Sequence, residues 1–186
     1  MNLRERWSQG LMHAGYAAML LGAFDPLEGA LLVLPGSALV LAGTCLEPRQ
    51  RPFAAYRLGV FALLALGIGA LFGLSAAGGF GGKSGLSPGW AILLLPYLAG
   101  WPLGILGPGN PRWVHLGGVL VGLWLLTIPV ILIRQTLLHP NPARPFLPEG
   151  LITVALLGAV TVGGCLWRLR HRPAPPTTAP RPAPPR

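Results

Sequence analysis

The chain has 186 residues, of which 52% are hydrophobic and only 10% are charged, and its mean hydropathy is +0.58. Because a soluble domain carries roughly 25% charged residues, this chain has too little charge to cover a surface that faces water. The composition therefore excludes an ordinary soluble domain and predicts that lipid is the solvent of the folded chain.

The formal net charge of +9 is typical of proteins that bind nucleic acid. The basic residues, however, lie mostly near predicted helix ends, and five of them lie in the C-terminal stretch (Arg168, Arg170, Arg172, Arg181 and Arg186). Such placement is typical of a signal for membrane topology, with added attraction to anionic lipid. We therefore expect a lipid bilayer as the partner and no nucleic acid.

The first predicted span covers about residues 5–24 and is followed, without an A-x-A cleavage pattern, by a second span at about 27–46. Between them, Asp25 can accept hydrogen bonds from the free N–H groups of the second helix, and Pro26 suits a first helical position. Glu28 stands at the capping-box position. We predict a tight hairpin, and a re-entrant pair of half-helices is the alternative.

The same combination of capping residue and proline recurs along the chain. Ser87 and Asn110 each directly precede a proline, Arg51 precedes Pro52, and Pro148 is followed by Glu149. The four later spans are expected at about 53–77, 88–106, 111–138 and 148–167. The fold class predicted is thus all-α, a polytopic transmembrane bundle of six spans within residues 1–172.

The distribution of Lys and Arg predicts the orientation of this bundle. With both termini in the cytoplasm, 11 of these residues lie in inner segments and three (Lys83, Arg134 and Arg144) in outer ones. The positive-inside rule therefore favours N-in and C-in, in a cell inner membrane. Residues 173–186, rich in Pro, Ala and Arg, are expected to form a disordered cytoplasmic tail.

Small residues at intervals of four predict how the helices pack, because close backbone approach holds helices together in lipid. The stripes are Ala14, Ala18 and Gly22; Ala65, Gly69, Gly73 and Ala77; Gly100 and Gly104; Gly118 and Gly122; and Ala155, Ala159 and Gly163. They indicate a compact bundle and provide faces for other membrane-protein subunits.

Two groups of residues suggest a nucleotide or metal site. The stretch 77–84 matches a relaxed phosphate-loop pattern, but that loop requires a preceding strand and an immediately following helix, so we expect no nucleotide. Asp25 and Glu28 are paired carboxylates that could hold a cation, but helix capping explains both. Cys45 and Cys165 have no metal-ligand spacing. We therefore expect no metal.

His13 and His115 lie within spans, and a pair of histidines on two helices could bind a tetrapyrrole. Nothing in their spacing requires it, and a hydrogen-bonded histidine near the membrane interface is the simpler interpretation. No charged residue falls at the centre of a predicted span, which argues against a proton- or ion-driven transporter.

The segment LGAFDPLEGALLVLPGSAL, residues 21–39, resembles one found in small uncharacterised bacterial multi-pass membrane proteins that share an Asp-Pro-Leu-Glu-Gly hairpin. The resemblance covers the first hairpin, and it implies a bacterial inner membrane without implying an activity.

Together these observations predict a non-enzymatic scaffold or accessory subunit of a membrane assembly, without a cofactor. The alternative is a small-solute carrier or channel, with a water-filled cavity bordered by the kinking prolines Pro35, Pro96 or Pro129. A tetrapyrrole-binding membrane protein at His13 and His115 is the third hypothesis.

The capping hypothesis for Asp25 predicts a loss of stability, not of a specific activity, in Asp25→Ala. Loss of an N-cap costs about 0.5–2 kcal/mol, and we expect the upper half of that range at a hairpin tip with little water. Asp25→Asn and Asp25→Ser should restore much of the loss because both side chains still cap. Thermal unfolding in detergent measures all three variants. Three melting curves like that of the parent would show that the cap assignment is wrong.

Overall fold

The structure is a computed structural model that describes residues 3–24, 28–78, 92–138 and 148–171. Across these residues it is helical without strands, which confirms the all-α prediction. The helices are α1 (Leu3–Gly22), α2 (Ala30–Leu46), the 3₁₀ turn η1 (Arg51–Phe53), α3 (Ala54–Ala76), α4 (Leu95–Leu106), α5 (Arg112–Leu138) and α6 (Pro148–Arg170).

The first two helices are continuous and lie against each other. At 1.5 Å per residue, the 20 residues of α1 and the 17 of α2 span roughly 30 and 26 Å, which favours the hairpin over half-helices. α2 begins at Ala30, later than the predicted residue 27, because Glu28 and Gly29 form the preceding turn and their carbonyls accept the first N–H bonds.

α4 is the shortest α-helix of the described chain, with 12 residues from Leu95, whereas the prediction began at residue 88. A 3₁₀ turn at 92–94 precedes it, and residues 79–91, with Ser87 and most of the glycine-rich stretch, lie outside the described residues. Pro35 and Pro129 lie inside helices, as predicted, and so does Pro102. The expectation for Pro96 was wrong, since it stands in the first turn of α4, where its missing N–H costs no helical bond.

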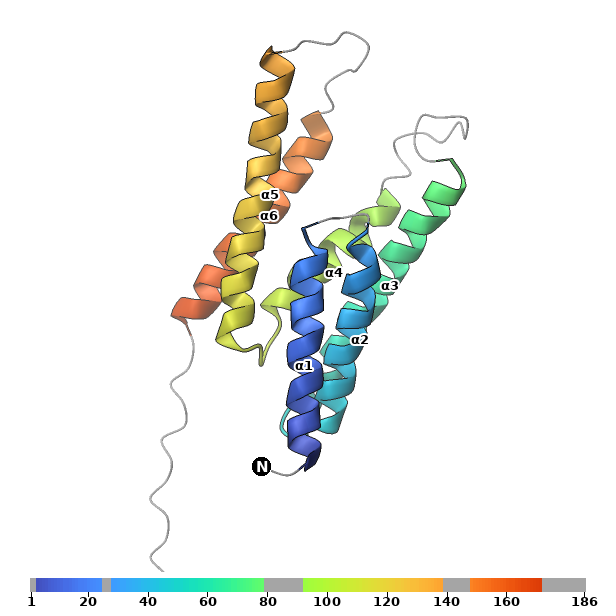
Figure 1. The fold of residues 1–186 in the computed structure, drawn as a ribbon, viewed down its shortest axis with the longest axis vertical. Helices are drawn as coiled ribbons and strands as arrows, with labels where there is room; N and C mark the ends of the chain where they lie inside the picture. The colour runs from blue at the N-terminus through green and yellow to red at the C-terminus, as the bar shows by residue number, and fades with distance from the viewer. Residues whose placement is uncertain (1–2, 25–27, 79–91, 139–147, 172–186) are drawn as a thin grey trace, which may run out of the picture.

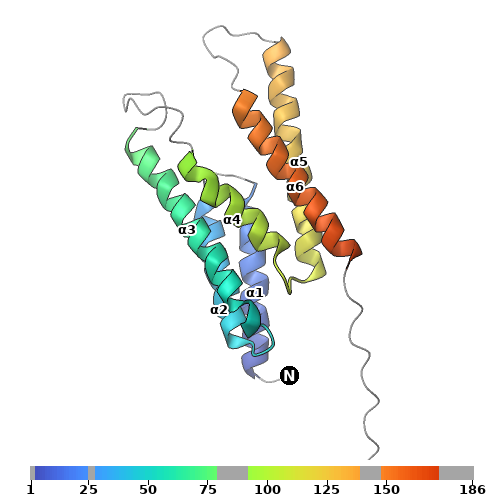
Figure 2. The same cartoon turned by 180° about the vertical axis from the view of Figure 1, so that it is seen from behind.

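Successive helices run in alternating directions, so α1 begins and α6 ends at the same end of the bundle (Figure 1). We call this the terminal end. α1 to α4 form one group and α5 with α6 form a second pair, as the view from behind also shows (Figure 2). α4 contacts α5 and α6, and α1 contacts α5. The last turn of α4 and the start of α5 therefore lie where the two groups meet.

Three helical segments are long and apolar enough to cross a membrane, namely Arg51–Ala76, Arg112–Arg134 and Leu151–Arg170. α1 is long enough but begins with Arg4, Glu5 and Arg6. The apolar segments Ala30–Leu46 and Ile92–Leu106 are shorter than the roughly 20 residues that a bilayer core demands. The membrane interpretation is thus supported by three helices that are both long and apolar enough among the described residues.

Glycines bring two pairs of helices into backbone contact. A Cβ atom added to Gly15 of α1 would lie 2.5 Å from the carbonyl oxygen of Gly36 in α2, and one added to Gly158 of α6 would lie 2.8 Å from that of Gly122 in α5. Side chains larger than hydrogen cannot fit at such distances, so these glycines set the α1–α2 and α5–α6 spacing.

The predicted small-residue stripes divide into packed and open faces. Gly104 packs on Met19, and Gly118 packs on Cys165 and Ile105. Gly69 and Gly73 of α3 and Gly163 of α6, in contrast, have no atom within 4 Å of an added Cβ. For α3 and α6, therefore, the expectation that these stripes hold the bundle together was wrong, because both helices use other faces for their contacts.

Candidate functional site

A network of hydrogen bonds surrounds the buried Arg57, where α1, α3 and the α4–α5 turn meet. We call Tyr16, Tyr56, Arg57 and Asn110 the Arg57 cluster. It exists because α4 ends abruptly: Gly107 is extended, Pro108 has no N–H, and Gly109 has a positive φ of 76°. The last carbonyls of α4 are consequently left without helical donors and need partners from other elements.

Side chains from α3 and from the turn supply these partners. Tyr56 Oη donates to the Leu103 carbonyl at 2.6 Å, and Arg57 Nη1 donates to that of Gly104 at 3.3 Å. Asn110 Nδ2 donates to the carbonyls of Gly104 and Ile105 at 3.0 and 2.7 Å. The end of α4 is therefore capped by side chains that lie up to 47 positions away in the sequence.

Asn110 also joins α1 to this cap through its oxygen. Its Oδ1 accepts a hydrogen bond from Tyr16 Oη at 2.6 Å and another from Arg57 Nη2. Arg57 Nη2 donates in addition to the Pro108 carbonyl at 2.8 Å. One amide side chain thus connects α1, α3 and the end of α4.

The charge of Arg57 is balanced by dipoles and aromatic faces. The side chain is only 4% exposed, and its guanidinium carbon lies 5.5 Å from the Tyr16 ring centre and 5.7 Å from that of Tyr56. Such contacts and the negative end of the α4 dipole both favour a cation. No carboxylate of the described residues pairs with Arg57, and its Nε has no hydrogen-bond partner among them. The hydrogen bonds of this cluster to the α4 carbonyls are those of a structural cap.

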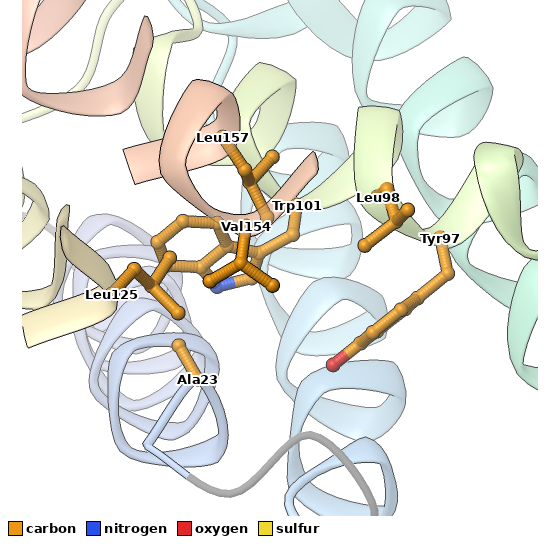
Figure 3. A pocket seen from close by; sticks show the side chains of 7 residues that line it. All are labelled: Ala23, Tyr97, Leu98, Trp101, Leu125, Val154 and Leu157. Atoms are coloured by element: carbon orange, nitrogen blue, oxygen red, sulfur yellow. The ribbon is translucent and has the colours of Figure 1, made fainter. Parts of the chain in front are cut away.

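A separate apolar cavity of about 140 Å³ lies between the two helical groups. Figure 3 shows the Trp101 ring in it, with Leu125 from α5 and with Val154 and Leu157 from α6 close by. The remaining lining residues are Ala23, Tyr97 and Leu98. Trp101 Nε1 donates to the Met19 carbonyl at 3.0 Å, so its polar atom is satisfied within the protein. A cavity with such walls suits an apolar group and offers little to water or an ion.

The two histidines occupy different environments. His13 is exposed, its Nδ1 is 2.7 Å from the Gln9 carbonyl, and its ring stacks on Trp113 at 5.7 Å. His115 is buried at 2% exposure. The ring that stacks on His13 is that of Trp113 and not that of His115. The exposed His13 and the buried His115 therefore do not form one enclosed pair of ligands.

Most predicted capping residues stay untested. Asp25, Pro26 and Ser87 lie outside the described residues, and α2 has Gly29 at its N-cap position. Asn110 lies just before α5, and its role as an N-cap of that helix stays a prediction. The contacts of its side chain in the structure are with α1, α3 and α4. Among the described residues, no group of three or more His, Cys, Asp or Glu could hold a metal ion.

Sequence reasoning missed Arg57 as an interior residue, because it was counted among the charges that set topology. A signal was present in the chain: a Tyr-Arg pair early in one apolar helix, and a Gly-Pro-Gly-Asn-Pro break that strands carbonyls at the end of another. What the sequence does not contain is the pairing of those two helix ends.

Compared with known proteins, the chain matches no family model, no curated sequence and no solved structure.

Proposed function

We propose that the chain is a multi-pass protein of a bacterial inner membrane that crosses six times with both termini in the cytoplasm, and that it is a non-enzymatic scaffold or accessory subunit. The membrane placement is supported by the three long apolar helices and by large apolar side chains exposed on every long helix, for example Leu66, Leu120 and Leu156. The alternating helix directions fit an even number of crossings (Figure 1).

One observation carries the accessory role: α3 presents an exposed face built mainly from small residues. Its members recur every three or four residues, and all are exposed: Gly59, Ala62, Leu66, Gly69, Gly73 and Ala76. We call this the open α3 face. The three glycines have nothing within 4 Å of an added Cβ. In lipid, small-residue faces of this kind let a second helix approach closely, so a transmembrane helix of another subunit is the partner that fits.

Gly69→Leu combined with Gly73→Leu tests this partner face. Both positions are open, so the fold should remain intact, and leucine favours helix more than glycine by about 1 kcal/mol per position. We expect the double variant to lose a partner that co-purifies stoichiometrically with the parent from native membranes in mild detergent. Gly163→Leu on α6, an equally open glycine, is the matched control and should keep the partner.

Two results would contradict the accessory role. One is a parent chain that purifies as a clean monomer without a stoichiometric partner. The other is a partner that the double variant retains as well as the control does.

The small-solute carrier is the second candidate, and the cavity around Trp101 is the observation in its favour. The apolar lining suits an apolar solute better than an ion or a sugar. Uptake of an apolar solute into vesicles that is lost when Ala23→Phe fills the cavity would support the carrier over the scaffold. The tetrapyrrole hypothesis is supported only by the fact that His13 and His115 are histidines, a residue type that can bind such a ring.

A further inference from the structure

A second hollow lies on the outside of the bundle, between α4 and α6. It is an open groove of about 570 Å³ whose walls are almost wholly apolar. The α4 wall is Leu95, Leu98, Ala99, Pro102, Leu103 and Leu106, and the α6 wall is Thr153, Leu156, Leu157 and Val160. Leu95, Leu156 and Val160 are more than half exposed, so this groove faces the surroundings of the bundle. In the proposed membrane placement, those surroundings are acyl chains.

The groove has the length of one bilayer leaflet. From Leu95 to Leu106 the helix rises roughly 16 Å at 1.5 Å per residue, which is close to half of a hydrocarbon core about 30 Å thick. Leu98 and Leu157 line both the groove and the cavity around Trp101, so the two hollows adjoin across these side chains.

The groove ends at the terminal end of the bundle, where Gly164 of α6 meets Leu106 of α4. A Cβ added to Gly164 would lie 2.8 Å from a Leu106 methyl carbon, so these residues close the groove. Arg168 follows Gly164 by one helical turn on the same side of α6. The Arg168 side chain is half-buried, and its guanidinium carbon lies 5.5 Å from the centre of the Trp167 ring. It is close enough to the Tyr56 phenol to act on it electrostatically. Among the described residues, it has no carboxylate partner. Tyr56 in turn hydrogen-bonds the Leu103 carbonyl at the groove wall.

We propose that this groove binds an acyl chain of an anionic phospholipid from the leaflet at the terminal end, with the headgroup phosphate at Arg168. The apolar groove matches the acyl chain, and the Arg168 cation, one turn beyond the end of the groove and without a carboxylate partner in the described part of the chain, matches the phosphate in charge and in depth. The proposal rests on the membrane placement and is independent of the accessory role, since the site contains no residue of the open α3 face.

The test is native mass spectrometry of the purified full chain with added phosphatidylglycerol or phosphatidylcholine that carry the same acyl chains. The parent should retain phosphatidylglycerol in preference to phosphatidylcholine. Arg168→Gln should reduce phosphatidylglycerol binding about fivefold, the usual effect of one basic residue at a membrane surface, with little change for phosphatidylcholine. Arg170→Gln is the matched control, because it removes the same charge from the same helix end but two residues on, which faces another side.

The groove itself is tested with Ala99→Phe, which places a ring in it from an exposed position of α4. Binding of both lipids should fall, whereas Ala17→Phe on the outward side of α1 should leave it unchanged. If Ala99→Phe does not fold, Thr153→Phe fills the groove from α6. The proposal would be overturned if the groove-filling variant bound as much lipid as the parent, or if Arg168→Gln and Arg170→Gln reduced phosphatidylglycerol binding equally. A dimer that only the groove-filling variants lose would also overturn it, since a second copy would then occupy the groove.

Discussion

Replacing Arg57 with alanine is expected to lower the free energy of unfolding by about 2–5 kcal/mol, as when a large buried side chain is truncated to alanine. The reason is that the guanidinium donates to the Gly104 and Pro108 carbonyls and to Asn110 Oδ1. The Pro108 carbonyl would lose the donor that Arg57 Nη2 provides, at a cost of about 1–3 kcal/mol, whereas the Gly104 carbonyl and Asn110 Oδ1 would keep Asn110 Nδ2 and Tyr16 Oη as donors. Unfolding by a rising fraction of denaturing detergent, followed by circular dichroism, measures the change.

Two further variants make this result specific. Arg57→Lys keeps the charge but has no planar fork, so it should restore only part of the loss. Arg51→Ala removes an exposed arginine six positions away whose Nε is 3.4 Å from the Cys45 carbonyl, and it should change stability by less than about 0.5 kcal/mol. An Arg57→Ala variant as stable as Arg51→Ala would show that the cluster does not hold the end of α4.

The Arg57 cluster explains how a short helix can connect the two helical groups. α4 has 12 residues, too few to contribute many hydrogen bonds of its own beyond its ends. Its C-terminal carbonyls are tied to α3 through Tyr56 and Arg57, and its following turn is tied to α1 through Asn110 and Tyr16. Loss of this cap would free the element that contacts both α3 and α6, so its effect should spread to the interface between the two helical groups.

The sequence predicted those features that depend on local pattern. Apolar runs and proline starts placed helices close to α5 and α6, since a run of about 20 apolar residues has few alternatives to a helix in lipid. The same reasoning placed α4 too early, because residues 88–94 are as apolar as the helix that follows and hydropathy cannot mark the boundary between them.

Features that depend on which helices meet were not predictable from one sequence. Arg57 lies three residues after the start of α3. At such a position, the sequence around an arginine that lies at a membrane boundary does not differ from the sequence around an arginine that caps another helix. Its burial follows from the position of the α4 end, which is a tertiary fact. Likewise, Gly67 of α3 packs on Tyr97, whereas Gly69 is open, although both belong to the same glycine-rich helix. Only the rotation of α3 about its axis relative to α4 decides which of these glycines contacts α4.

Gly15→Ala should destabilise the α1–α2 hairpin by about 3 kcal/mol, at the upper end of the usual cost of overpacking. The added Cβ would lie 2.5 Å from the Gly36 carbonyl oxygen and 2.9 Å from the Val40 nitrogen. Both are backbone atoms of α2, so no side chain can rotate out of the way, and the helices must move apart. Separation would also weaken the neighbouring contact at Gly22, where an added Cβ lies 2.5 Å from the Gly29 carbonyl oxygen.

Gly10→Ala provides the matched control, because it is the same substitution on the same helix at a position with nothing within 4 Å. There the change should stabilise the protein by up to about 1 kcal/mol, since alanine favours helix over glycine. The two variants therefore differ only in what the new methyl group meets, and their melting temperatures in detergent should move in opposite directions. If both rise together, α1 and α2 are not in backbone contact at Gly15, and the hairpin must be held instead by the larger side chains around Tyr16 and Met19.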